Sequence, residues 1–171
     1  SAGADYTFNS LLKDLLEPGA EYVFGHRWSC HVEPFTSGCA ALLMPGAHAM
    51  AGTPDGVLSH TISSASWHNC WVNGRLVGET VLMAAIAGSF GVPAVYASGD
   101  AALSREIAAL LGGKVAFAQV KKGLGRFAAQ CLAPDDARAL IEEKVLEVLS
   151  SPRSWPKPYK IPGPVELKVE L

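Results

Sequence analysis

The chain has 171 residues, of which 49% are hydrophobic and 18% are charged, and its formal net charge at pH 7 is −2. This length and composition favour one folded domain with a sizeable core and argue against disorder. Lys and Arg are neither in excess nor clustered, which argues against nucleic-acid binding, and no apolar run is long enough to cross a membrane.

The cysteines are scattered along the chain, with no CxxC pair and no dense framework. They are Cys30, Cys39, Cys70 and Cys131. In a chain with a large core, this pattern predicts reduced, mostly buried thiols, and hence a cytoplasmic protein.

The N-terminal part of the chain combines short elements with one long loop. Residues 5–16 form an amphipathic pattern that predicts a helix, and residues 21–24 are a short strand candidate. The apolar run at residues 39–44 (CAALLM) suits a buried strand. Residues 45–66 are rich in Gly, Ser, Thr and Pro and carry two histidines. A loop of this length inside a compact domain is usually functional.

From residue 71 onward, helices and strands alternate. Residues 71–77 (WVNGRLV) predict a hairpin in which Asn-Gly supplies the turn. The remaining predicted elements are helices at residues 79–90, 101–111 and 134–149, strands at residues 92–97, 115–120 and 165–171, and an extended proline-rich segment at residues 151–164. This alternation predicts a single α/β domain with a mixed, partly parallel sheet flanked by helices.

Two histidines on the long loop are the first candidates for chemistry. His48 closely follows the strand at residues 39–44, and His60 lies on the same loop. Binding crevices in α/β folds form at the carboxyl ends of strands, which favours a site here. Either histidine taken alone is more often a surface or hydrogen-bonding residue than a ligand.

Glu79 and the segment around Cys30 hold further candidate groups. Glu79 begins a helix, where a carboxylate is favoured by the helix dipole, but it is also a group that zinc and harder divalent metals accept beside imidazole. Residues 30–33 (CHVE) bring together a thiol, an imidazole and a carboxylate. A Cys–His nucleophile pair there is the weaker hypothesis, because neighbours in sequence rarely have the required geometry.

Several ordered motifs resemble those of the M55 D-aminopeptidase family. They are residues 46–61 (GAHAMAGTPDGVLSHT), residues 72–79 (VNGRLVGE), residues 87–100 (AGSFGVPAVYASGD) and residues 120–134 (VKKGLGRFAAQCLAP). The similarity runs from about residue 8 to the end of the chain. Several motifs in the same order and spacing are far more specific than any one of them.

The resemblance implies a zinc aminopeptidase that hydrolyses short peptides with N-terminal D-residues and assembles as a homo-oligomer. By the same resemblance, His48 and Glu79 correspond to metal ligands, and His60 to a histidine that acts in catalysis without binding the metal. A metal ion makes water nucleophilic near neutral pH and polarises the scissile carbonyl, while a nearby histidine transfers protons.

The family pattern also contains parts that have no counterpart in these residues. Family members begin with a strand carrying an Asp-x-Glu metal pair and continue to an Asn-Asp-x-His segment, and they extend further at the C-terminus. We therefore expect the remaining ligands to come from another segment, or else from replacements among His26, Cys30, His31 and Glu33. The alternative function is a non-catalytic or repurposed member, or subunit, with an incomplete metal site.

Overall fold

The structure, a computed structural model, describes residues 16–22, 33–36 and 38–171. Helices and strands alternate along most of this length. In chain order the elements are α1 (Glu33–Thr36), β1 (Leu42–Met44), β2 (Asn69–Val72), β3 (Arg75–Leu76), α2 (Glu79–Ser89), β4 (Ala94–Asp100), α3 (Ala101–Leu110), β5 (Ala116–Gly125), β6 (Ala128–Cys131), α4 (Pro134–Leu149), the 3-10 turn η3 (Pro152–Ser154) and β7 (Leu167–Glu170).

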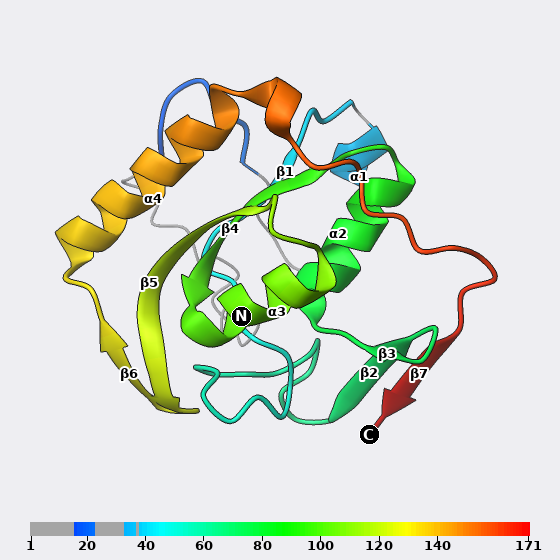
Figure 1. The fold of residues 1–171 in the computed structure, drawn as a ribbon. Coiled ribbons are helices and arrows are strands. Elements are labelled where there is room, and N and C mark those ends of the chain that lie inside the picture. The colour runs from blue at the N-terminus through cyan, green and yellow to red at the C-terminus, as the bar shows by residue number, and fades with distance from the viewer. Residues whose placement is uncertain (1–15, 23–32, 37) are drawn as a thin grey trace.

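Four strands form the main sheet, in the order β1-β4-β5-β6. The first three run parallel, and β6 returns antiparallel to β5. Helix α4 packs on one side of these strands, and α2 and α3 on the other (Figure 1). All seven residues of β4 are buried, as expected for a parallel strand covered on both faces. The predicted α/β fold, with a mixed, partly parallel sheet flanked by helices, is therefore confirmed.

A second, smaller sheet has the order β3-β2-β7, and all of its pairs are antiparallel. Asn73 and Gly74 join β2 to β3 with φ angles of 49° and 75°, so the predicted hairpin turn is confirmed. The predicted C-terminal strand is also present as β7, and it pairs with β2.

Some predictions near the N-terminus and around β5 differ from the structure. The strand expected at residues 115–120 continues to Gly125 and turns back as β6, which was not predicted. Residues 21–22 are not in a strand, and the rest of that prediction, like the helix at residues 5–16 except its last residue, lies outside the described residues. Residue 16 is not helical.

The expectation of mostly buried thiols is wrong for the described cysteines. Cys70 is buried in the small sheet, whereas Cys39 and Cys131 are exposed. Cys39 precedes the short β1, and Cys131 ends the edge strand β6, so neither reaches the core. Cys30 lies outside the described residues.

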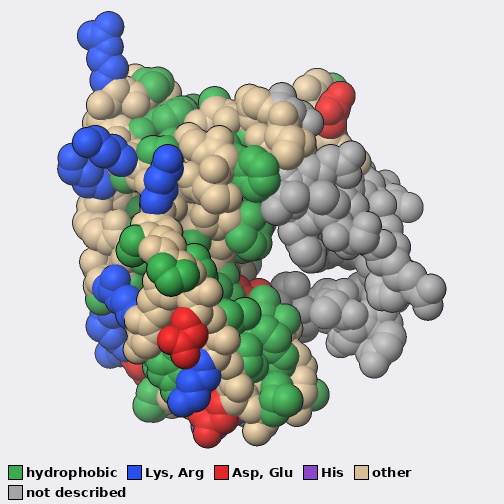
Figure 2. Space-filling view, turned by 90° about the vertical axis from the view of Figure 1, so that its right-hand side faces the viewer, with side chains coloured by type: hydrophobic (Ala, Val, Ile, Leu, Met, Phe, Trp, Pro, Cys, Tyr) green, Lys and Arg blue, Asp and Glu red, His purple; other side chains and the backbone are tan. Residues whose placement is uncertain are grey.

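The face that carries the C-terminal segment is turned to the viewer in Figure 2. Hydrophobic side chains form patches there among Lys, Arg, Asp and Glu side chains. An apolar groove of about 500 Å³ lies between α2 and the C-terminal segment, lined by residues that include Val72, Leu82, Ile86, Val165 and Leu167. Across the described residues, no helix combines the length and apolar character that a membrane span requires.

Candidate metal centre

The loop that follows β1 is bonded directly to the end of β4. Ser98 accepts two backbone N–H groups, from Gly46 at its hydroxyl (3.0 Å) and from Ala47 at its carbonyl (2.9 Å). At Gly99, a Cβ atom would lie 2.5 Å from the Ala47 carbonyl oxygen, so only glycine permits this approach. The next residue, His48, is therefore held at the carboxyl end of the parallel strands, where α/β folds form their crevices.

Two carboxylates hold the rest of the loop. Asp100 is fully buried and caps α3 by accepting from the Leu103 N–H (2.8 Å). Its second oxygen accepts from the Val57 N–H (2.6 Å). Glu106, on α3, accepts from the Met50 N–H (2.7 Å). The loop segment on either side of His48 is thus fixed by groups that belong to β4 and α3.

Glu79 reaches the same place from α2, where it is the first helical residue. Its neighbour Gly78 packs so closely on Met50 that a Cβ at position 78 would lie 2.9 Å from the Met50 Cβ. The Glu79 carboxylate also accepts from the Ile62 N–H (2.7 Å). This bond ties the start of α2 to the chain just beyond His60.

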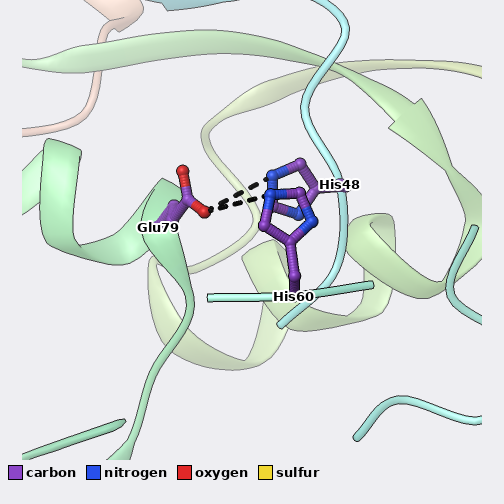
Figure 3. A group of neighbouring side chains, drawn as sticks. All are labelled: His48, His60 and Glu79. Atoms are coloured by element: carbon purple, nitrogen blue, oxygen red, sulfur yellow. Dashed lines mark ion pairs between the residues drawn. The ribbon is translucent and has the colours of Figure 1, made fainter. Parts of the chain in front are cut away.

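The three candidate side chains converge (Figure 3). The Oε1 atom of Glu79 lies 3.6 Å from His48 Nε2 and 3.5 Å from His60 Nε2. The two imidazole rings stack with centroids 3.7 Å apart. One potential ligand atom from each residue lies within 4.8 Å of the other two. Two ligands of one metal ion lie within about 3–5 Å of each other, and the ligand atoms of His48 and Glu79 meet that requirement.

The backbone selects which imidazole nitrogen faces Glu79. His48 Nδ1 lies 3.1 Å from the Ala49 carbonyl oxygen, and His60 Nδ1 lies 2.6 Å from the Leu58 carbonyl oxygen. A carbonyl only accepts, so each Nδ1 carries a hydrogen, and in the neutral form of each ring Nε2 presents its lone pair toward Glu79. Metal-binding histidines have the same arrangement, in which the second ring nitrogen donates to a carbonyl or carboxylate. This donor set fits a divalent metal ion.

The surroundings keep His48 neutral. Burial is the main influence that lowers its pKa below the usual value, and the positive charge of a protonated His60 would lower it further. The Ala49 carbonyl and Glu79 act in the opposite direction but do not reverse the shift. A neutral imidazole is the form that binds metal ions, so His48 need not lose a proton to do so.

A polar cavity of about 340 Å³ adjoins His60. Its wall is built from the site loop, the segment before β2 and the turn between β5 and β6. The lining residues are Ala51, Gly52, Thr53, Pro54, Ser59, His60, Ser64, Trp67, His68 and Arg126. The volume is within the range of small-molecule sites. The larger groove beside α2 contains none of the three converging residues, so we assign the chemistry to the cavity at His60.

The proposed replacement ligands cannot be placed at this site. His26, Cys30 and His31 lie outside the described residues. Glu33 begins α1, but only its backbone is described. The nucleophile hypothesis for Cys30 falls in the same undescribed segment.

The sequence analysis did not identify Glu106, which supports the loop that carries His48. A usable signal was present, because Ala102, Leu103, Glu106 and Ile107 share one face of α3 by helical spacing. The other three are buried core residues. A carboxylate on such a face requires a partner, and the Met50 N–H is that partner.

Glu106 should make stability depend on pH. Burial, with repulsion from Asp100, raises the pKa of Glu106 to about 7 against an ordinary value of 4.5, although the Met50 N–H opposes the shift. The folded state therefore keeps this proton at pH values where the unfolded chain has lost it. The stabilising contribution is complete below about pH 4.5 and is lost as the pH rises toward 7.

Replacing Glu106 with glutamine removes this titration while retaining an oxygen for the Met50 N–H. The free energy of unfolding of the variant relative to wild type should therefore rise by about 2 kcal/mol between pH 4.5 and pH 8, allowing for solvent screening of a partly exposed carboxyl. Urea unfolding in the presence of a chelator measures the difference at each pH. The control Glu142→Gln changes an exposed carboxyl on α4. The difference between its free energy of unfolding and that of wild type should be the same at both pH values. A pH-independent difference for the Glu106 variant would refute the expectation.

Comparison with known proteins bears directly on this arrangement. A family model described as D-aminopeptidase, of the M55 peptidases, matches residues 4–171. The chain belongs to the M55 D-aminopeptidase family. The family resemblance expected from the ordered motifs is thereby confirmed.

A curated sequence and a solved structure can each be compared with this chain. A D-aminopeptidase from Bacillus subtilis (strain 168) is 33% identical over 164 residues, which cover 95% of this chain and 58% of that protein. Among solved structures, the Zn-dependent D-aminopeptidase DppA from Bacillus subtilis, described as a self-compartmentalizing protease, matches with a TM-score of 0.82 and 31% identity over 95% of this chain and 58% of that one. The chain thus spans somewhat over half the length of the curated sequence and of the solved chain that it matches.

Proposed function

We propose that this chain acts as a zinc-dependent aminopeptidase or amidase that hydrolyses short peptides, among them peptides with an N-terminal D-residue. The observation that carries the proposal is the convergence of His48, His60 and Glu79 on one point beside a polar cavity. Membership of the M55 family supports it, as does the relative that is described as Zn-dependent. Zinc accepts imidazole nitrogen and carboxylate oxygen together.

We assign His48 and Glu79 as metal ligands and His60 as the residue that moves protons. When bound, zinc supplies Lewis acidity for the scissile carbonyl and makes water a stronger acid. The Leu58 carbonyl accepts the Nδ1 hydrogen of His60, and Nε2 is the nitrogen that accepts a proton from the attacking water. The same nitrogen then returns that proton to the leaving amine. The Ile62 N–H holds the Glu79 carboxylate in place throughout.

A metal ion in a catalytic zinc site needs at least three protein ligands, and two are assigned here. We therefore propose that the other ligands come from a segment outside residues 38–171, as the Asp-x-Glu and Asn-Asp-x-His pattern of the family implies. We also propose a homo-oligomeric, cytoplasmic protein. The relative described as self-compartmentalizing supports the first property, and the free thiols of Cys70 and Cys131 support the second.

Chelation and metal return test the proposed activity. The purified protein should release the N-terminal residue from D-alanyl peptides, lose this activity in a chelator and regain it when zinc is added. Chromatographic detection of free alanine gives the rate, elemental analysis gives the zinc content, and light scattering gives the oligomer mass. Protein that holds stoichiometric zinc yet cleaves neither D- nor L-alanyl peptides would identify a non-catalytic family member instead.

A further inference from the structure

The cavity beside His60 has an unbalanced charge. Among its described lining residues, one is a permanent cation, Arg126, and two are histidines, but none is Asp or Glu. The ion pairs found among the described residues do not include Arg126; its guanidinium carbon instead lies 5.3 Å from the centre of the Phe127 ring. Asp55, on the loop that follows β1, forms its ion pair with Arg105 instead. Arg105 Nη2 lies 2.7 Å from Asp55 Oδ1. Within the part of the chain that the structure describes, this cavity therefore offers a cation that no carboxylate pairs with.

The backbone at Arg126 is fixed relative to the site loop. The Arg126 carbonyl accepts from the Leu58 N–H (2.8 Å), and the Leu58 carbonyl in turn bonds His60. Nearby on β5, Gly123 packs so tightly that a Cβ there would lie 2.0 Å from the Asp55 carbonyl oxygen. The end of β5 and the turn that follows it thus contact the loop at two points, and Arg126 lies at the wall of the cavity that adjoins His60.

We infer that Arg126 is a specificity-determining residue that binds the C-terminal carboxylate of a short peptide substrate. The inference rests on the proposed function and adds to it the group that recognises the leaving part of the substrate. In a dipeptide the carboxylate lies one residue, roughly 3.5 Å of extended chain, beyond the scissile bond. A guanidinium matches a carboxylate with two parallel hydrogen bonds, which a neutral amide terminus cannot form.

The test compares D-alanyl-glycine with D-alanyl-glycinamide, which differ only in the terminal charge. Arg126→Ala should lower the ratio of kcat/KM for the acid to kcat/KM for the amide by about 10- to 100-fold. Arg126→Lys, which keeps the charge but loses the planar fork, should give an intermediate ratio. The control Arg138→Ala removes an exposed arginine of α4 that pairs with Asp135, and its ratio should equal that of wild type.

Binding measured without turnover separates this inference from the proposed function. In the His60→Ala background, calorimetry should show the Kd of D-alanyl-glycine rising 10- to 100-fold on loss of Arg126, with a smaller change for the amide. If wild type hydrolyses the peptides but loss of Arg126 weakens binding of the acid and the amide equally, the role of Arg126 is overturned and the aminopeptidase function stands. If Arg126 selects the acid in binding but zinc-loaded wild type hydrolyses neither substrate, the role of Arg126 stands and the aminopeptidase function is overturned.

Discussion

Replacing Glu79 with glutamine is expected to reduce zinc affinity by at least about 100-fold, and hydrolysis should fall with the zinc content. Residues that only support a ligand already change metal affinity by about 10- to 100-fold, so loss of a charged ligand should be at least as large. Glutamine keeps the shape of the side chain and an oxygen for the Ile62 N–H, so the fold should persist. Titration against a competing chelator and elemental analysis measure the effect.

The matched control for this change is Glu142→Gln, which removes the same charge from an exposed position on α4. It should bind zinc as wild type does. Circular dichroism of both variants without metal checks that the helices are retained. Stoichiometric zinc in the Glu79 variant at wild-type affinity would contradict the role of Glu79 as a ligand and would return it to a helix-start carboxylate bonded to Ile62.

Replacing His60 with alanine should lower turnover by roughly 10²- to 10⁴-fold while the zinc content stays at the wild-type level. The loss reflects the missing proton transfer between water and the leaving amine. The stacked position of His60 against His48 makes the comparison informative, because their Nε2 atoms lie at nearly the same distance from Glu79, 3.5 and 3.6 Å. Metal content and single-turnover rates should be measured on the same preparation.

The companion variant His48→Ala should lose zinc and activity together. The pair of variants therefore separates a ligand from a proton-transfer residue, although the two side chains occupy similar positions. A parallel loss of zinc and activity in the His60 variant would make His60 a third ligand. In that case another group would have to accept the proton from water.

Local signals account for the elements that the sequence predicted well. Helix α4 was predicted with both ends correct, because Pro134 suits the first turn and Asp135 and Asp136 follow it. The Asn73-Gly74 pair favours a tight hairpin turn, and the structure has that turn. β6 was missed because its residues, AAQC, have little strand preference, and only pairing with β5 makes them a strand. The position of β1 beside β4 likewise depends on a crossover that no local pattern encodes.

The candidate site was predictable only in part, for a related physical reason. His48 and His60 share a loop whose length and composition indicated function, and the family motifs pointed to Glu79. The supports of the site are long-range contacts, such as Met50 with Glu106 and Val57 with Asp100. Each joins residues more than 40 positions apart, so neither partner indicates the other in the sequence.

The attachment of the His48 loop to β4 and α3 has a consequence for how the site meets its ligands. Ser98, Asp100 and Glu106 bind backbone N–H groups of the loop, and none of these bonds requires an ion or a substrate. The conformational entropy of the loop is therefore lost when the chain folds, not when a ligand arrives. Binding therefore does not include the entropic cost of ordering this loop. Association also does not wait for a slow rearrangement of the loop.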